Sequence, residues 1–353
     1  MKVLQIINSL AIGGAERLIV DTTPLSPTVM TDILILNKTD STFEEELMNK
    51  STSVYFLNRH IYNPLLIFDI IKYINKYDII HAHLFPTLYW VGLAKLLSHS
   101  DTKIIFTEHS TTNRRRNHFL LKRMDRLIYN IYHKLICISP KVKQSLSNYL
   151  KRDDIVVVNN GIDLSRYRTM EKVSAKDKFH IDEGKVIIQI AGFRISKDQA
   201  TTIRAMSLLP EEYHLVLVGD GELKPKHQTL VKELNLSHRI HFLGKRSDIP
   251  SLLYAADIVV VSSNWEGFGL AAVEGMAARK PVIASNVEGL DDVIGDAGIL
   301  FEKGNEIELS SIIKRLCSDK SYYDMVTNRC YERAFEYDIN KMKRELIKEY
   351  SNV

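Results

Sequence analysis

Two glutamates, Glu266 and Glu274, stand eight residues apart in a segment otherwise rich in glycine, alanine and aliphatic side chains, SSNWEGFGLAAVEGMAARKPVIAS (262–285). The segment has the pattern of a buried strand, a glycine loop and a helix, so the N–H groups of residues 268–270 are expected to form an anion site. Glu266 then lies in the loop above the anion, and Glu274 lies about one turn into the helix on the same side. Because one carboxylate can bind two vicinal hydroxyls, the pair suits the two ends of a sugar nucleotide. Alternatively, one glutamate balances the helix dipole and the other is a buried acid satisfied locally.

Two further loops combine strand ends with groups that attract phosphate. Arg194 and Lys197 follow the apolar run of QIAGFRISKDQ (189–199) and can approach one anion together, although a solvated loop has the same composition. Gly13 and Gly14 stand between a first strand and a helix, where glycine permits a close backbone approach to an anion or forms a simple tight turn. None of these loops has the dinucleotide pattern G-x-G-x-x-G, which argues against a nicotinamide enzyme.

Short apolar runs must position these loops, and they alternate with helical patterns along the whole chain. The runs are continuous rather than alternating with polar residues, which indicates strands buried on both faces of a parallel sheet. We therefore expect an α/β protein with two Rossmann-like, doubly wound parallel sheets. The expected strands are KVLQII (2–7), DILIL (32–36), VYFL (54–57), DIIHAHL (78–84), KIIFTEH (103–109), KLICIS (134–139), IVVV (155–158), VIIQIAG (186–192), YHLVLVG (213–219), RIHFLG (239–244), DIVVVSS (257–263), PVIAS (281–285) and AGILF (297–301).

A chain of 353 residues exceeds the size at which one hydrophobic core keeps growing, so two domains are expected. A charged stretch without a strand, residues 163–185, marks the break between them. We place the first domain at 1–164, the second at 165–337 and a C-terminal helix at 338–353. Three cysteines without close spacing favour a reduced, cytoplasmic protein, and neither a signal peptide nor a transmembrane segment is expected.

Positive charge is concentrated in the first half of the chain. Residues 1–165 hold 20 Lys and Arg against 15 Asp and Glu, whereas the later residues hold 27 against 28. Much of the excess lies in RRRNHFLLKRMDR (114–126), where apolar residues recur at helical spacing. This segment is either a solvated helix face or a surface for an anionic membrane or a diphosphate-bearing acceptor. No nucleic-acid partner is expected.

The spacing of Glu266 and Glu274 resembles the E-x7-E signature of retaining glycosyltransferases of the GT-B fold, in particular glycosyltransferase family 4, the group 1 glycosyl transferases. The resemblance extends over nearly the whole chain. It implies that the first domain binds the acceptor, that the second binds a nucleotide sugar, and that the C-terminal helix crosses back to the first domain. The similar segments are GGAERL (13–18), DIIHAHLFPTLYW (78–90), TEHSTTNRRRN (107–117), NNGID (159–163) and, most specifically, AADIVVVSSNWEGFGLAAVEGMAARKPVIAS (255–285).

The resemblance also implies a role for each matching residue. Glu274 would hold the ribose hydroxyls of the donor, and Glu266 would face the donor sugar. The family has an arginine where this chain has Gly192, so we expect Arg194 to reach the diphosphate from a shifted register. The other implied contacts are Gly267, Phe268, Gly269 and Leu270 at the sugar and phosphate, Arg194 and Lys197 at the diphosphate, Gly13 and Gly14 approaching it from the first domain, His109 at the donor sugar, and Gly244, Lys245 and Arg246 near the base.

Together these expectations describe a retaining, metal-independent glycosyltransferase of the hexosyltransferase type, with no cofactor. It would move a sugar from a nucleoside diphosphate sugar, UDP favoured over GDP, to a glycan or polyprenyl-diphosphate-linked acceptor in bacterial surface polysaccharide synthesis. It would act in the cytoplasm or peripherally at the inner face of the cytoplasmic membrane. The departure at Gly192 leaves open a non-catalytic sugar-nucleotide-binding partner of a transferase, and the fold leaves open a nucleotide-sugar epimerase.

One histidine is a further candidate for chemistry. His109 stands at a strand end, where it contacts the donor sugar or serves as a hydrogen-bonded structural residue. His81 and His83 share one strand, and we expect them to face opposite sides of the sheet and to form no metal site.

Overall fold

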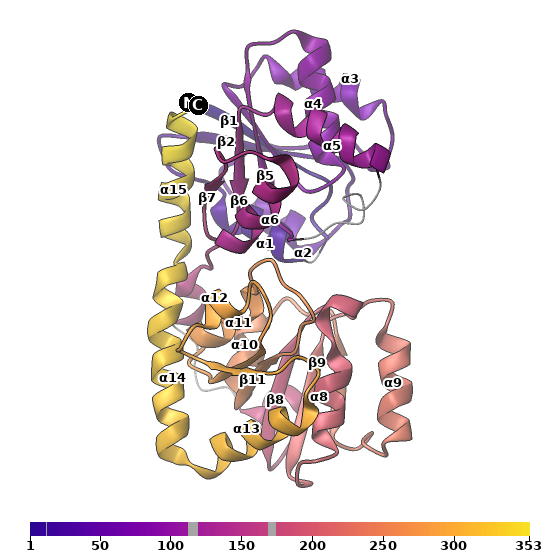
Figure 1. Ribbon diagram of the computed structural model, residues 1–353, viewed down its shortest axis with the longest axis vertical. Helices are drawn as coiled ribbons and strands as arrows, with labels where there is room; N and C mark the ends of the chain where they lie inside the picture. Colours follow the sequence, from indigo (N-terminus) through magenta and orange to yellow (C-terminus); the bar gives the residue numbers. More distant parts are fainter. Residues whose placement is uncertain (12, 112–118, 169–173) are drawn as a thin grey trace. The chain divides into compact units, whose positions relative to one another are not determined.

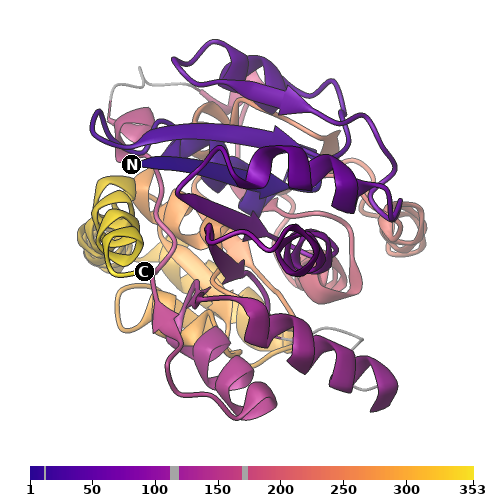
Figure 2. The ribbon, with the colours of Figure 1, turned by 90° about the horizontal axis from the view of Figure 1, so that it is seen from above.

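The computed structural model describes residues 1–11, 13–111, 119–168 and 174–353, and it divides into two compact units (Figure 1). The first unit contains Met1–Gly161 together with Ile339–Val353, and the second contains Ile162–Asp338. The first segment therefore ends at Gly161, where the sequence predicted an end at residue 164. Both ends of the chain belong to the first unit (Figure 2).

All neighbouring strands of the first sheet are parallel, in the order β3-β2-β1-β4-β5-β6-β7. The order of connection reverses between β1 and β4, and ligands of such sheets bind outside the carboxyl ends of the strands at that point. The strands are β1 (Lys2–Ile7), β2 (Met30–Ile35), β3 (Val54–Phe56), β4 (Ile79–His83), β5 (Lys103–Glu108), β6 (Lys134–Cys137) and β7 (Val156–Val157).

Helices cover both faces of the first sheet (Figures 1 and 2). Helix α1 contacts α2 and α15 on one face, while α3, α4 and α5 form a row of neighbours on the other. Residues 112–118 lie outside the described part of the chain, so the basic segment predicted at 114–126 is seen only from α5 onward. The helices are α1 (Gly14–Thr22), α2 (Thr42–Met48), α3 (Leu66–Ile74), α4 (Thr87–Ser98), α5 (Phe119–Ile131), α6 (Pro140–Leu150) and α15 (Ile339–Ser351).

The second sheet is also parallel throughout, in the order β10-β9-β8-β11-β12-β13. Helices α8, α9 and α13 are neighbours, and α11 contacts α10, α12 and α14. The strands are β8 (Lys185–Ile190), β9 (Tyr213–Val218), β10 (Ile240–Gly244), β11 (Ile258–Val261), β12 (Val282–Ser285) and β13 (Ile299–Phe301). The helices are α7 (Ala175–Phe179), α8 (Gln199–Met206), α9 (Lys224–Glu233), α10 (Ile249–Ala255), α11 (Leu270–Ala277), α12 (Asp291–Ile294), α13 (Glu306–Ser318) and α14 (Lys320–Ala334), with 3-10 turns η2 (Leu164–Tyr167), η3 (Ile195–Lys197) and η4 (Phe335–Tyr337).

Every apolar run expected to be a strand forms one, so the predicted α/β fold with two doubly wound sheets is confirmed. The continuous apolar pattern has the expected cause, because all residues of β4 and β11 are buried. Several strands are shorter than predicted at their carboxyl ends. At these ends the last residues of the apolar runs, such as Gly192 and Ser263, are not part of a strand and begin the loops.

The C-terminal helix α15 packs on the first sheet through Met342, Leu346 and Tyr350. These residues recur every fourth position, so they line one face of the helix. Outside this face, Lys134 Nζ of β6 lies 2.9 Å from the Glu349 carboxylate. The helix therefore completes the core of a unit whose other elements lie more than 170 residues earlier in the chain.

The described residues form no helix that is both long enough and apolar enough to cross a membrane. None of the three cysteines forms a disulfide in the described chain; Cys137 and Cys330 are buried and Cys317 is half-buried.

Replacing Leu346 by alanine is expected to destabilise the first unit by about 2–4 kcal/mol, because it removes a buried side chain that borders a cavity. Native-state hydrogen exchange of β1 peptides measures this loss, and amides there should exchange about 30-fold faster or more. Arg344→Ala, an exposed change on the same helix, should alter the free energy of unfolding by less than about 0.5 kcal/mol. Equal effects of the two changes would show that α15 does not support this sheet.

Candidate functional site

In the second unit, the loops that follow β8 and β11 meet through an ion pair between Lys197 and Glu266. Ser263 donates its hydroxyl to the same carboxylate oxygen, Oε1, over 2.8 Å. Both charged side chains are mostly buried, with 28% of Lys197 and 12% of Glu266 exposed. A carboxylate held by a cation and a hydroxyl in this way has a fixed orientation at the edge of the sheet.

Backbone contacts fasten the two loops to each other on either side of this pair. Asn264 donates its backbone N–H to the carbonyl of Ser196 over 2.8 Å and its side-chain amide to that of Ile195 over 2.7 Å. From β8, the amide of Gln189 donates to the carbonyl of Lys197 over 3.0 Å. The polar groups of the pair are therefore held by ordered backbone.

Two glycines allow the loop before α11 to pack closely. Gly269 has a φ of 91°, and a Cβ there would come within 2.4 Å of the Leu290 side chain. Gly289 has a φ of 88°, and a Cβ there would come within 2.4 Å of the Glu266 carbonyl oxygen. Helix α11 then begins at Leu270 and carries a half-buried Glu274. The strand, loop and helix predicted for this segment are confirmed by the bounds of β11 and α11.

Arg194 is exposed, and its guanidinium folds back over Gly192. A Cβ at Gly192 would lie 3.9 Å from Arg194 Nε and 3.4 Å from the carbonyl oxygen of Asp220. The φ of Gly192 is outside the left-handed region, so the backbone does not require glycine there. Arg194 thus brings a guanidinium into the space where a side chain at residue 192 would begin.

The loop after β10 holds the residues predicted to lie near the base. Gly244 has a φ of 67°, and no atom lies within 4 Å of the position that its Cβ would take. Lys245 is exposed. Arg246 binds Asp248 with two nitrogens, at 2.8 and 2.9 Å, and with Lys178 this lowers the pKa of Asp248 to about 2. Arg246 is therefore engaged in shaping its own loop.

In the first unit, Gly13 and Gly14 begin helix α1 at the carboxyl edge of the sheet. Gly13 is extended, with a φ of −167°. A Cβ on Gly13 would come within 2.4 Å of a carboxylate oxygen of Glu16, which folds back over the start of the helix. An acidic group in the first turn is stabilising at a helix N-terminus, so Glu16 occupies the place that a phosphate would seek.

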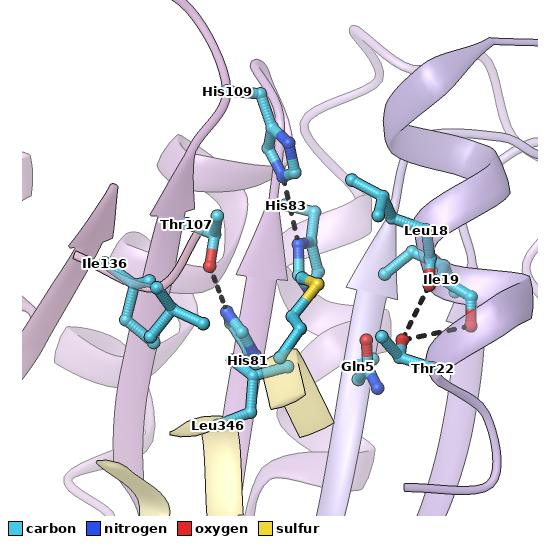
Figure 3. Close-up of a pocket in the computed structure, with 12 residues that line it drawn as sticks. Gln5, Leu18, Ile19, Thr22, His81, His83, Thr107, His109, Ile136 and Leu346 are labelled. Carbon is cyan, nitrogen blue, oxygen red and sulfur yellow. Dashed lines mark hydrogen bonds between the residues drawn. The ribbon is translucent and has the colours of Figure 1, made fainter. Parts of the chain in front are cut away.

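The expectation that His81 and His83 face opposite sides of the sheet is wrong. Residues two apart on a strand share a face, and the two rings are in contact, with centroids 4.1 Å apart and an interplanar angle of 37°. His83 Nδ1 in turn lies 3.3 Å from Nε2 of His109, which follows the neighbouring strand β5 (Figure 3). The three histidines form a continuous row on the face covered by α1 and α15.

Burial lowers the pKa of each histidine in this row. The pKa of His81 falls to about 3 and that of His109 to about 4, while His83 lies well below the ordinary value of 6.5. Desolvation is the largest cause for all three, because an imidazolium loses its hydration when buried. The row is therefore uncharged near neutral pH.

Two family models together match most of the chain. Residues 171–333 match the family described as Glycosyl transferases group 1, and residues 32–166 match Glycosyltransferase Family 4. The chain belongs to this glycosyltransferase family. The resemblance noted in the sequence is thereby confirmed at the level of the family.

Curated relatives of this glycosyltransferase include enzymes named for lipid-linked sugars. It is 27% identical to the UDP-Gal:alpha-D-GlcNAc-diphosphoundecaprenol alpha-1,3-galactosyltransferase of Escherichia coli, over 88% of this chain and 86% of that protein. It is 26% identical to the N-acetylgalactosamine-N,N'-diacetylbacillosaminyl-diphospho-undecaprenol 4-alpha-N-acetylgalactosaminyltransferase of Campylobacter jejuni, over 97% of each chain.

Solved structures of two other proteins show the same fold. Anabaena HepE in complex with UDP-glucose matches with a TM-score of 0.89 and 24% identity over all of both chains. WaaG, a glycosyltransferase involved in lipopolysaccharide biosynthesis, matches with a TM-score of 0.74 and 15% identity over 98% of both chains. The glycosyltransferase therefore has the predicted GT-B fold.

Within the second unit, the structure brings together Lys197 and Glu266, and it places Arg194 on the same loop as Lys197. Gly13, Gly14 and His109 belong to the first unit. Sequence reasoning missed Ser263 and His83. Ser263 lies three residues before Glu266, a spacing at which a serine hydroxyl can reach a loop carboxylate. His83 was not recognised because it was assigned to the wrong face of its strand.

In the described part of the chain, no group of three or more histidine, cysteine, aspartate or glutamate side chains is arranged to hold a metal ion. Metal independence remains a prediction.

The lowered pKa values predict that acid destabilises the first unit. Between the pKa of His81 in the folded chain, about 3, and its ordinary value of about 6.5, the unfolded chain binds more protons than the folded chain. The stabilising contribution of the neutral histidine is therefore complete above pH 7 and declines as the pH falls to 5. His81 should account for about 1–2 kcal/mol of this loss. The free energy of unfolding, measured with urea from pH 7.5 to 5, should depend on pH less steeply in His81→Gln than in wild type, by nearly one proton. The exposed control His60→Gln should leave this pH dependence unchanged. Identical slopes in His81→Gln and wild type would mean that His81 titrates normally in the folded chain.

Proposed function

We propose that this glycosyltransferase moves a sugar from a UDP-sugar to a lipid-linked glycan acceptor, with retention of configuration and without a metal ion. The observation that carries the proposal is the cluster of Lys197, Glu266 and Ser263 beside the start of α11. It combines a cation, an oriented carboxylate and the N–H groups at the start of a helix at one sheet edge. This combination suits a ligand that has a diphosphate next to sugar hydroxyls.

The cations act on the leaving group. When the bond from the sugar to the phosphate breaks, negative charge grows on the diphosphate while the sugar becomes oxocarbenium-like. Lys197 and Arg194 offset this charge, and the N–H groups at the start of α11 add their partial positive charge. Because these groups are already in place before the reaction, little reorganisation is needed as the charge develops.

Glu266 orients the donor sugar and does not attack it. Its Oε1 accepts from both Lys197 and Ser263, which lowers the availability of its lone pairs for bond formation. We therefore assign retention to attack on the same face as the departing phosphate, with that phosphate as the base. Glu274 holds the ribose, and Gly267 to Leu270 line the phosphate with their backbone.

The remaining roles follow the same logic. The open space at Gly244 allows the base to approach the backbone of Gly244 and Lys245, and Arg246 supports that loop through Asp248. We further propose that Gly13 and Gly14 contact the diphosphate, where phosphate would displace the Glu16 carboxylate, and that His109 contacts the donor sugar.

The names of the relatives support the choice of substrates. The Escherichia coli relative is named for UDP-Gal and a diphosphoundecaprenol acceptor, the Campylobacter jejuni relative is named for a lipid-linked acceptor, and HepE forms a complex with UDP-glucose. Family membership favours transfer over epimerisation. The position of Arg194 supports a catalytic protein over a non-catalytic partner, because it brings a guanidinium near Gly192.

A lipid-linked acceptor requires access to a membrane surface, and we propose that α3, α4 and α5 provide it. Arg126 donates to the Tyr149 carbonyl at 3.0 Å, so it holds α5 to the fold, whereas Arg123 is exposed. Exposed apolar and basic side chains on one row of helices suit the interface of an anionic bilayer. The exposed apolar residues of this row are Leu65 and Phe68 at α3, Leu96 and Leu97 on α4, and Met124 and Leu127 on α5.

Lys197→Ala should lower kcat/KM about 100-fold or more, because it removes a cation from the leaving group. Arg194→Ala should lower it about 10-fold or more, and adding Gly192→Arg should restore much of the loss, since residue 192 has room for a side chain. The exposed Lys232→Ala serves as the matched control. Transfer from UDP-sugars with an anomer-resolving NMR assay measures these effects. Full activity of the Arg194→Ala and Lys197→Ala variants would contradict the assignment, and loss of wild-type turnover with EDTA would contradict metal independence.

Leu127→Ser should weaken binding of the protein to anionic vesicles, because Leu127 is 69% exposed on the proposed membrane surface. Co-sedimentation with vesicles containing anionic or only zwitterionic lipid measures the binding. Ile307→Ser is the control, since Ile307 is 68% exposed but lies in the second unit. Equal loss in both variants, or no preference for anionic lipid in the wild type, would overturn the proposed surface.

A further inference from the structure

The row of histidines continues into a chain of hydrogen bonds that ends on the C-terminal helix. Nδ1 of His81 lies 2.6 Å from the Tyr350 hydroxyl of α15, and its Nε2 lies 2.7 Å from the Thr107 hydroxyl of β5. Both ring nitrogens of His81 are thus taken by hydroxyl groups, and Figure 3 shows the bond to Thr107. These bonds fix the ring of His81, and the His83 ring contacts it with the centroids 4.1 Å apart.

His83 uses one of its two ring nitrogens to contact His109. Its Nδ1 lies 3.3 Å from His109 Nε2, and both rings are held by strands that neighbour each other. The other nitrogen, Nε2 of His83, is buried and has no hydrogen-bond partner among the described residues. His83 itself is 6% exposed, so bulk solvent does not satisfy this atom.

His83 lines a small cavity. It has a volume of about 20 Å³ and is bordered by Gln5 and His83 of the sheet, Thr22 of α1 and Leu346 of α15. This volume accommodates about one water molecule. The side-chain amide nitrogen of Gln5 is the second buried polar atom of the lining that finds no partner among the described residues.

The pairing of two neutral imidazoles constrains where their protons are. If His109 donated from Nε2 to His83 Nδ1, then the proton of His83 would lie on its Nε2, and both buried nitrogens without a partner, those of His83 and Gln5, would be donors. One water would then have to accept from both of them and could use neither of its own O–H groups for these nitrogens. If His83 donates from Nδ1 instead, its Nε2 is an acceptor, and a water that accepts from Gln5 can donate to it. The second arrangement gives both nitrogens a partner and uses a donor as well as an acceptor of the water, so we favour it.

We propose that His83 is a positioning residue which, with a buried water held by Gln5, fixes His109 in the tautomer that carries its proton on Nδ1. His109 then presents a hydrogen-bond donor to its ligand, an acceptor oxygen of the donor sugar; this ligand rests on the proposed function. The tautomer itself follows from the hydrogen bonds of the first unit alone. His83 touches no substrate and acts only through His109.

The neutral state of the row supports this role. Burial lowers the pKa of both His83 and His109, so neither carries a second proton near neutral pH. A charged His109 would donate from both nitrogens whatever its neighbour did. A neutral His109 has one donor and one acceptor, and its partner decides which of them faces outward.

The tautomer is measured directly by long-range ¹H–¹⁵N NMR of histidine-labelled protein, with the His109 signals assigned from their loss in His109→Asn. In the wild type without ligand, His109 should show a protonated Nδ1 and an unprotonated Nε2. His83→Phe keeps the ring volume but removes the hydrogen bond, so His109 should change toward the Nε2-protonated form. His83→Asn, whose amide can replace the Nδ1 donor, should preserve the wild-type pattern.

Kinetics provide the second measurement. His83→Phe should lower kcat/KM about 3- to 10-fold with UDP affinity unchanged, and His83→Asn should restore it. A protonated Nε2 on His109 in the wild type, or an unchanged tautomer in His83→Phe, would overturn the proposal even if the enzyme is active. Absence of sugar transfer by the wild type would instead count against the proposed function, and it would leave the tautomer result standing.

Discussion

The parallel direction of every strand is the constraint on which the rest of the molecule depends. Because all strands of a parallel sheet end at the same edge, the topology alone places loops that are far apart in sequence next to each other at that edge. In the second unit this brings the residues after β8 and β11 close enough for Lys197 to pair with Glu266. Gly269 and Gly289 then remove the side chains that would keep the loops apart. The site is thus a consequence of topology, refined by a few glycines.

The two units accommodate polar side chains at the carboxyl edges of their sheets in different ways. The second unit keeps its charges and places them in ion pairs, Lys197 with Glu266 and Arg246 with Asp248. The first unit buries three histidines and holds them uncharged in a row of ring contacts and hydrogen bonds. Charge suits a diphosphate leaving group, whereas neutral donors and acceptors suit the hydroxyls of a sugar.

The sequence predicts the sheets well because their strands are buried on both faces, and a strand of this kind is a continuous apolar run in the sequence. It also predicts the loop before α11, since the glycines and the small helix residues reflect backbone requirements at Gly269. It predicts side-chain partners less well. The spacing of Ser263 and Glu266 allows their contact but does not require it, and nothing near His81 indicates Tyr350, which lies 269 residues later. The error over His81 and His83 was one of geometry, because their spacing already placed both on one face.

In the proposed function, Arg194 takes the role of the arginine that the family has where this chain has Gly192. The backbone of Gly192 is not in a conformation that demands glycine, and the nearest atom to a Cβ there, the Asp220 carbonyl oxygen, would be in ordinary contact at 3.4 Å. The fold therefore does not exclude an arginine at this position. Arg194 turns back through a bond from its N–H to the Gly192 carbonyl at 2.9 Å, which directs its long side chain over the same space. The guanidinium of an arginine lies several ångströms from its Cα. The long side chain can therefore compensate for moving the Cα from residue 192 to residue 194. What the chemistry requires is positive charge at the phosphate, and the position of the Cα that supplies it is free to move within that reach.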